Sequence, residues 1–365
     1  MTALAAEIRE RIRRDGPLSV AAYMELCLSH PAHGYYRRGR PIGAAGDFIT
    51  APEVSQMFGE LIGLWCAAVW QAMGRPRPVR LVELGPGRGT LLADALRAAE
   101  TVPPFRDAIE VHLVESSEAL RAEQAKLLSD AQPTWHERFE TVPPGPVLVV
   151  ANEFFDALPI RQFERVGDAW RERMVALAPS SQALRFTAAG KANAEVACLD
   201  AAPAGSIVER APAREALAAA LARRIAADGG AALIVDYGHD WPGIGDTLQA
   251  VRRHRPHGVL DDPGDADLTA HVDFFALAAA ARRAGAAAFG PVPQGGFLQA
   301  LGIEARAARL RQDASAQQRD AIDAALRRLT GADEMGLLFK ALAICRPTLG
   351  VPPGFEEHPA QAAAP

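Results

Sequence analysis

The sequence predicts an α/β fold built on a mostly parallel, doubly wound sheet, with a helical N-terminal region and a small β insertion. Three observations support this fold. An apolar run at 79–84 is followed by a glycine-rich turn and then by leucines at helical spacing, which is the order strand, tight turn, helix. Further strands and helices alternate beyond this unit, as they do in parallel sheets. The 365 residues are 49% apolar and 23% charged, a composition that buries a sizeable core.

Residues 1–75 are expected to form a helical N-terminal cap region. Apolar residues at helical spacing predict helices over 2–15, 20–28 and 54–73. The stretch Arg75-Pro76-Arg77-Pro78 separates this region from the sheet, because two prolines so close together interrupt regular structure.

The region 76–346 is expected to form the core, with insertions near 160–190 and 237–270, and 347–365 to form a flexible tail. The expected strands are 79–84, 110–115, 135–140, 146–151, 231–236, 286–292 and 335–345. The expected helices are 90–99, 117–129, a short one at 154–158, 210–227, 272–284, 296–311 and 315–330. Short antiparallel strands are expected within 160–190. The segment 237–270 is polar and is expected to be irregular.

The composition excludes several classes of protein. A net charge of −5 and a pI near 6.0 give no general nucleic-acid footprint. The four cysteines make no C-x-x-C pair, and neither cysteines nor histidines show the spacing of a metal site. No apolar run is long enough to span a membrane, and no targeting segment is recognised at the N-terminus. The sequence therefore predicts a cytoplasmic protein without membrane insertion.

The glycine-rich turn predicts a cofactor site. Gly85, Gly87 and Gly89 fall at alternate positions after a strand that contains Glu83, a spacing different from the dinucleotide fingerprint G-x-G-x-x-G. This pattern resembles motif I of class I S-adenosylmethionine-dependent methyltransferases, in which the strand acid lies near the amino-acid end of the cofactor. The alternative is a glycine-rich strand–helix turn that binds no ligand.

A second acid ends the next strand. Glu115 follows the apolar residues of 110–114, where a carboxylate can accept the two hydroxyl groups of a ribose. The alternative is a surface acid at the start of the helix 117–129.

Three polar residues follow the strand at 146–151. Ligands bind at the carboxyl ends of strands in such sheets, so Asn152, Glu153 and Asp156 are expected near the methyl group of the cofactor. The alternative is that they cap the short helix expected to follow.

Motifs spread over residues 34–340 resemble those of the MidA-like family, which is related to the mitochondrial complex I assembly arginine methyltransferase. The matching stretches are Gly34-Tyr35-Tyr36, 46–53, Phe58-Gly59-Glu60-Leu61, 83–89, 152–159, Asp236-Tyr237-Gly238, His271-Val272-Asp273-Phe274 and 335–340. The resemblance implies a class I methyltransferase (Rossmann-like) fold, S-adenosyl-L-methionine as cofactor with S-adenosyl-L-homocysteine as product, and a protein arginine as acceptor. By analogy the substrate is a respiratory complex I subunit.

The resemblance also suggests site residues. The stretch 46–53 precedes the core and is expected to cover the cofactor, with Asp47 facing its ammonium and Thr50 its carboxylate; the alternative is a simple helix start. A guanidinium acceptor needs carboxylates to orient it, and Glu153 and Asp156 are the expected catalytic pair. Two other functions remain open: a non-catalytic assembly factor that keeps the cofactor pocket, and a nucleotide-dependent oxidoreductase.

Overall fold

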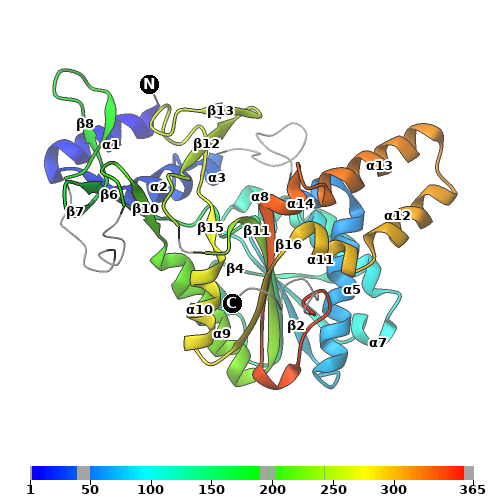
Figure 1. Ribbon diagram of the computed structural model, residues 1–365. Coiled ribbons are helices and arrows are strands. Elements are labelled where there is room, and N and C mark those ends of the chain that lie inside the picture. Colours follow the sequence, from blue (N-terminus) through cyan, green and yellow to red (C-terminus); the bar gives the residue numbers. More distant parts are fainter. Residues whose placement is uncertain (1, 39–49, 190–195, 197–201, 242, 357–365) are drawn as a thin grey trace. The chain divides into compact units, whose positions relative to one another are not determined.

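The computed structural model describes residues 2–38, 50–189, 196, 202–241 and 243–356 (Figure 1). The chain divides into two units. The first unit comprises Met1–Ile49, Phe155–Ala216 and Trp241–Asp273, and the second, which contains the large sheet, comprises Thr50–Phe154, Leu217–Asp240 and Phe274–Pro365. Residues 1–49 therefore group with two later segments, whereas the helix expected over 54–73 groups with the sheet.

In its described residues, the first unit contains three helices and small antiparallel sheets. Its helices are α1 (Ala3–Asp15), α2 (Val20–Ser29) and α3 (Tyr35–Arg38). One sheet has the strand order β1 (Leu18–Ser19), β8 (Met174–Leu177), β9 (Leu184–Thr187). A second has the order β10 (Ile207–Arg210), β6 (Arg161–Val166), β7 (Ala169–Glu172). A third has the order β13 (Arg255–His257), β12 (Gln249–Arg252), β14 (Asp267–Thr269). Strand β15 is Val272–Asp273. A core of its own fills this unit, with Leu4, Ile8, Tyr23, Val175 and Leu268 all buried.

The second unit is built on one large sheet. Its strand order is β16 (Ala287–Pro293), β17 (Phe339–Cys345), β11 (Gly230–His239), β5 (Val147–Asn152), β2 (Val79–Leu84), β3 (Ile109–Val114) and β4 (Thr134–His136). The strands from β11 to β4 pair in parallel, and β17 and β16 add antiparallel pairs at one edge. The mostly parallel sheet predicted from the sequence is confirmed.

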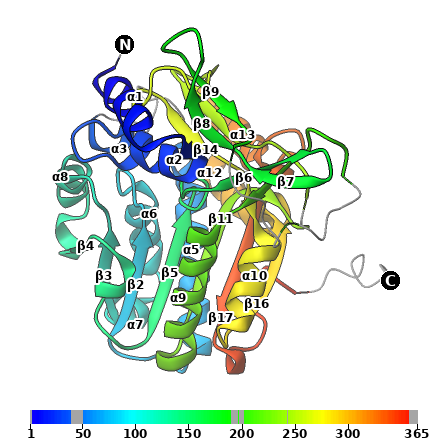
Figure 2. The same cartoon turned by 90° about the vertical axis from the view of Figure 1, so that its left-hand side faces the viewer.

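Helices cover both faces of this sheet. Figures 1 and 2 show α9 (Pro212–Asp228) and α10 (Phe274–Arg283) on one face and α5 (Gln56–Ala72) on the other. The other α-helices are α4 (Ala51–Val54), α6 (Thr90–Ala99), α7 (Pro103–Arg106), α8 (Glu118–Leu127), α11 (Gln294–Ala300), α12 (Ile303–Gln312), α13 (Ala316–Thr330) and α14 (Met335–Leu338). Short 3-10 turns occupy Ser129–Ala131, Phe139–Thr141 and Pro347–Leu349.

Four expectations for local structure were wrong. The last strand was expected over 335–345, but residues 335–338 form the helix α14 and the strand β17 begins only at Phe339. The segment 237–270, expected to be irregular, contains the sheet of β12, β13 and β14, because its short strands pair with each other rather than with the large sheet. No helix forms at 154–158, where the Leu158 amide bonds the Phe155 carbonyl in a single turn before Pro159. The helix expected over 296–311 is two helices, separated at Gly302, which has a φ of +89°.

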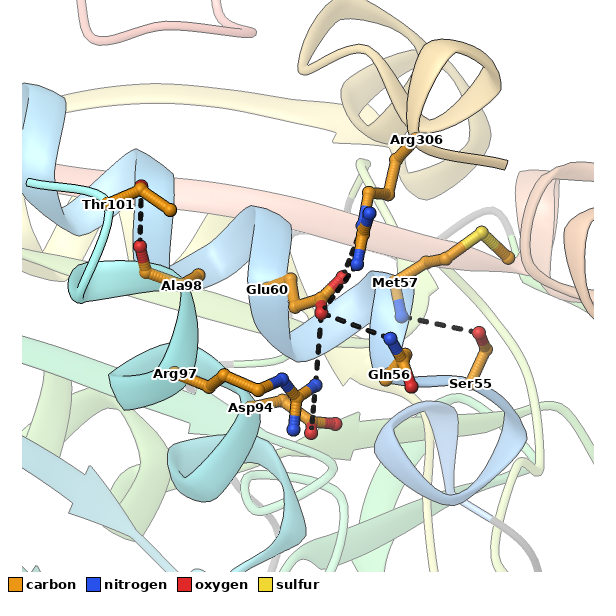
Figure 3. Close-up of polar contacts among 9 residues, drawn as sticks. All are labelled: Ser55, Gln56, Met57, Glu60, Asp94, Arg97, Ala98, Thr101 and Arg306. Atoms are coloured by element: carbon orange, nitrogen blue, oxygen red, sulfur yellow. Dashed lines mark hydrogen bonds and ion pairs between the residues drawn. The ribbon is translucent and has the colours of Figure 1, made fainter. Parts of the chain in front are cut away.

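A buried carboxylate joins three helices of the second unit. Glu60 of α5 accepts hydrogen bonds from Arg97 of α6 at 3.0 Å and from Arg306 of α12 at 2.7 and 3.0 Å (Figure 3). Gln56 adds a bond at 3.1 Å. Burial raises the pKa of Glu60, but the hydrogen bonds from the two arginines outweigh burial and leave that pKa below its ordinary value. Glu60, Gln56, Arg97 and Arg306 together form the Glu60 cluster. This cluster holds α6 in place, and with it the turn that precedes α6.

Replacing Glu60 by alanine is expected to lower the free energy of unfolding by about 2 kcal/mol, because both arginines lose their buried counter-charge. Urea unfolding at neutral pH measures this loss. Because the pKa of Glu60 is lowered in the folded state, the stabilisation is present above the ordinary glutamate pKa and is lost as the pH falls through the lowered value.

Asp323→Ala is the matched control, since Asp323 pairs with Arg311 on the exposed surface. That variant should lose no more than about 0.5 kcal/mol. Equal losses in the two variants would contradict a special contribution from the Glu60 cluster.

Candidate functional site

Polar side chains gather on one face of the sheet at the ends of three neighbouring strands. Glu83 of β2 is in register with Leu113 of β3 and with Val150 of β5. Successive side chains alternate between faces, so Glu115 and Asn152, each two residues further on, lie on the same face as Glu83. All three are buried, with exposed fractions of 3% for Glu83 and 8% for Glu115 and Asn152. The three residues predicted from the sequence thus lie at neighbouring strand ends, and their role in cofactor binding stays a prediction.

The glycine turn lies directly after β2. Gly85 has a φ of +61°, and its amide donates to the Val114 carbonyl of β3 at 3.0 Å. A Cβ atom at this position would lie 2.5 Å from the Phe154 ring, so both the backbone conformation and the close approach require glycine. Gly87 and Gly89 also have positive φ, and Gly89 is the N-cap of α6 without a side-chain cap. Main-chain groups of the glycine turn, and not side chains, are therefore available to a ligand beside the strand ends.

Glu115 is held in a defined orientation. Its Oε1 accepts from the Ser117 amide at 2.7 Å, and its Oε2 is 3.4 Å from Nε2 of Gln124. The same Gln124 nitrogen donates to the Gly87 carbonyl at 2.7 Å, which connects the acid to the glycine turn. Burial raises the pKa of Glu115, and the bonds from Ser117 and Gln124 act against that rise.

Glu83 and Asn152 keep buried polar atoms without a hydrogen-bond partner. Within the described part of the chain, neither Oε2 of Glu83 nor Oδ1 of Asn152 has a donor. Burial raises the pKa of Glu83 to about 8, and the negative charge of Glu115 adds to that rise. Since buried acceptors without donors are uncommon in folded proteins, these two atoms indicate a site for a ligand that carries donors.

Glu153 follows β5 in an unusual backbone conformation. Its φ is +49°, in the left-handed region that few residues other than glycine adopt. Its Oε1 accepts from the Ala51 amide at 2.8 Å and from Nδ2 of Asn152 at 3.0 Å. The carboxylate therefore caps the first turn of α4. Thr50 is the N-cap residue of α4, but its side chain makes no capping bond.

Glu53 of α4 was not singled out from the sequence. Its Oε1 accepts from the Thr90 hydroxyl at 2.6 Å, and its Oε2 accepts from Arg88 at 3.2 Å. Helix α4 is thus bound at one end to the exit of β5 and at the other to the start of α6. The signal in the sequence was an acid three residues after the N-cap Thr50, but its partner depends on the tertiary structure.

Asp156, the other expected catalytic residue, belongs to the first unit. Its main-chain carbonyl accepts from the buried Arg214 at 2.8 Å and from the Ala270 amide at 3.1 Å. The charge of Asp156 also acts on Tyr36. The pKa of Tyr36 lies well above its ordinary value, mainly because the residue is buried and to a smaller extent because of the negative charges of Asp267 and Asp156. Asp47, expected beside the cofactor, lies outside the described residues.

Comparison with known proteins identifies the family. The model of the S-adenosyl-L-methionine-dependent methyltransferase family Methyltransf_28 matches residues 61–292. The chain belongs to this family. The mitochondrial protein arginine methyltransferase NDUFAF7 homolog of Drosophila melanogaster is 39% identical, over 93% of this chain and 84% of its own length. The mitochondrial protein arginine methyltransferase NDUFAF7 of Homo sapiens is 38% identical, over 84% of this chain and 75% of its own length.

Solved structures agree with this assignment. A protein from Burkholderia thailandensis, crystallised with S-adenosyl-homocysteine, superposes with a TM-score of 0.85 and 30% identity, over 96% of this methyltransferase and 94% of that chain. The class I methyltransferase fold and the S-adenosyl-L-methionine cofactor predicted from the sequence are confirmed.

The expectation of a cytoplasmic protein is contradicted by the relatives, which are named as mitochondrial proteins. The expectation was based on the lack of a recognisable targeting segment, and an absence of that kind does not establish where a protein is located. In the described part of the chain, no helix combines the length and the apolar character needed to cross a membrane.

The residues at the strand ends fit the cofactor of the family. S-adenosyl-L-methionine carries an ammonium group, whose three N–H donors match the buried acceptors Glu83 Oε2 and Asn152 Oδ1. It also carries a ribose, and the fixed carboxylate of Glu115 is an acceptor of the kind that binds two hydroxyl groups.

Replacing Glu53 by alanine is expected to weaken S-adenosyl-homocysteine binding about tenfold, because hydrogen bonds to a charged acceptor contribute about 1.5 kcal/mol. Calorimetric titration measures the dissociation constant. Glu123→Ala is the control: it removes the other ion pair of Arg88, at 3.7 Å, but leaves α4 attached. An unchanged affinity in Glu53→Ala would exclude a contribution of α4 to the site.

Proposed function

We propose that this methyltransferase acts on an arginine side chain of a protein. Two of its relatives, from Drosophila melanogaster and Homo sapiens, are named protein arginine methyltransferases. The observation in this chain that supports the proposal most directly is the conformation of Glu153. Its backbone lies in the left-handed region and its carboxylate is fixed by two donors at the end of β5. Strained backbone of this kind clusters at functional positions.

An arginine acceptor explains why carboxylates are needed. The guanidinium is protonated at every accessible pH, and its lone pairs are delocalised. A carboxylate that binds the guanidinium orients it and localises electron density on the nitrogen that attacks. In the proposed site Glu153 has this role. Asp156 is proposed as the second carboxylate from its position in the chain, three residues further on.

The residues at the strand ends are assigned to different parts of the cofactor. We assign Glu83 and Asn152 to the amino-acid end, and Gly85, Gly87 and Gly89 to the close approach of the backbone. Glu115 is assigned to the ribose. The Thr50 hydroxyl, which makes no cap bond, is assigned to the cofactor carboxylate, and Asp47 keeps its assignment from the sequence alone.

These residues contribute to the reaction by positioning and electrostatics. When bound, the cofactor supplies an electrophilic methyl group. Transfer is an in-line displacement, so the rate depends on holding the acceptor nitrogen on the axis of the breaking bond. The carboxylate of Glu153 holds the cationic acceptor in place and stabilises positive charge on it as the new N–C bond forms. The acceptor nitrogen gives up one N–H proton to bulk water, so the methylated guanidinium keeps a single positive charge.

A subunit of respiratory complex I is our proposal for the protein substrate. Its support is the resemblance of the motifs at 46–53 and 152–159 to the MidA-like family, which includes an assembly arginine methyltransferase of complex I. A non-catalytic assembly factor is the competing function.

Glu153→Gln is expected to slow methyl transfer by about a hundredfold or more, because the neutral amide binds a guanidinium poorly. The amide oxygen still accepts from the Ala51 amide, so the fold and the affinity for S-adenosyl-homocysteine should change little. Transfer rates are measured with labelled S-adenosyl-L-methionine, and affinity by calorimetry. Glu164→Gln, the same change on β6, is the matched control. Full activity of Glu153→Gln would remove this assignment.

The substrate is identified by incubating the protein and labelled cofactor with a lysate of the source organism, followed by mass spectrometry of the labelled protein. Label on an arginine, present with the wild type and absent with Glu153→Gln, supports the proposed function. Label on another residue type rejects arginine as the acceptor. No label despite intact cofactor binding favours the assembly factor.

A further inference from the structure

The carboxyl group of Glu83 is buried without a positive partner. Within the described residues no lysine, arginine or histidine forms an ion pair with it, and its Oε2 has no hydrogen-bond donor. Its exposed fraction is 3%. An ionised carboxylate is unfavourable in such a place unless a counter-charge is supplied.

The charged groups on the neighbouring elements do not supply that counter-charge. Directly after β3, Glu115 is itself negative, and the nearby Arg121 donates to the Glu115 main-chain carbonyl. On α4, Glu53 is bound by Arg88 of the glycine turn.

Charged side chains on two further elements of the second unit are also committed to other contacts. On α6, Arg97 is paired with Asp94 and with Glu60 of α5. At the exit of β5, Glu153 is negative and accepts from the Ala51 amide and from Asn152.

The S-adenosyl-L-methionine cofactor carries the positive charge that the described residues do not supply to Glu83. Its sulfonium is permanently positive and its ammonium is a donor as well as a cation. The product differs in one respect that matters here: loss of the methyl group converts the sulfonium into a neutral thioether. A carboxylate in a site of low polarity therefore has a larger favourable interaction with the donor than with the product.

We propose that Glu83 is a specificity-determining residue that is neutral in the ligand-free protein and ionises when the cationic cofactor binds. The O–H bond of the Glu83 carboxyl group breaks, its electron pair stays on the carboxylate, and the proton passes to bulk water. The carboxylate then neutralises the positive charge of the donor. After transfer the positive charge at sulfur is gone, so Glu83 takes up a proton more readily and the product is released more easily. The inference rests on the cofactor of the family and not on arginine as the acceptor.

Burial and the charge of Glu115 support this assignment, because together they raise the pKa of Glu83 to about 8. Below that pH the ligand must displace a proton, so its affinity should rise about tenfold per pH unit as the pH rises toward 8 and then level off. Near pH 7 binding should release close to one proton.

Calorimetric titration tests the proposal directly. S-adenosyl-L-methionine is titrated into the ligand-free protein in phosphate and in Tris, whose ionisation enthalpies differ, at several pH values. The difference in observed heat gives the number of protons released. We expect close to one proton near pH 7, almost none above about pH 9, and a smaller release with S-adenosyl-homocysteine. Equal heats in the two buffers at pH 7 would overturn the proposal, and this test needs no variant.

Two variants assign the proton. Glu83→Gln should bind with no proton release, with an affinity independent of pH and with less preference for the donor over the product. Glu115→Gln should still release a proton, at a lower pH than the wild type, because the neighbouring negative charge is gone. If release disappears in Glu115→Gln and persists in Glu83→Gln, the proton belongs to Glu115 and the proposal is wrong.

Thermal unfolding of the ligand-free protein provides a readout without any cofactor. Because the pKa of Glu83 is raised in the folded state, its contribution to stability is complete below the unfolded pKa and is lost as the pH rises through about 8. The difference in Tm between wild type and Glu83→Gln should therefore grow in favour of the variant between pH 5 and 8. A difference that does not change with pH would contradict a neutral Glu83. None of these outcomes depends on the identity of the methyl acceptor.

Discussion

The site depends on one constraint: the carboxyl group of Glu83 is buried, and none of the described residues supplies a positive charge to it. A second acid, Glu115, lies at the end of the next strand and makes ionisation of Glu83 harder. A protein built for stability alone would place an apolar residue here, because an uncompensated buried acid is destabilising. The position makes sense when the missing charge belongs to a cationic cofactor.

The surrounding structure keeps this arrangement rigid. The main chain of Gly85 passes against the Phe154 ring with no room for a side chain, and Gln124 connects Glu115 to the Gly87 carbonyl. Helix α4 is held at both ends, by Glu153 at its first turn and by the bond between Glu53 and Thr90. Preorganisation of this kind lets the residues act electrostatically without rearranging when charge shifts.

The features that the sequence indicated and those that it did not differ in one physical respect, namely whether they depend on local patterns or on distant contacts. Glu83, Glu115 and Asn152 were found because a parallel sheet brings the carboxyl ends of its strands to one edge, and strand ends can be read from apolar runs. Glu53 was missed, since its partners Thr90 and Arg88 are 37 and 35 residues away and nothing local indicates them. The sheet formed by β12, β13 and β14 was missed for a related reason, because short polar strands have no strong periodicity.

The sequence by itself determined the mostly parallel sheet, the glycine turn, the cofactor and the acids at the strand ends, because each depends on local patterns that the sheet repeats. Tertiary structure alone decided how those acids behave. Whether Glu83 is charged depends on burial and on Glu115, 32 residues later, and the orientation of Glu153 depends on an amide contributed by Ala51. Protonation and orientation are properties of an environment, and residues distant in the chain supply that environment.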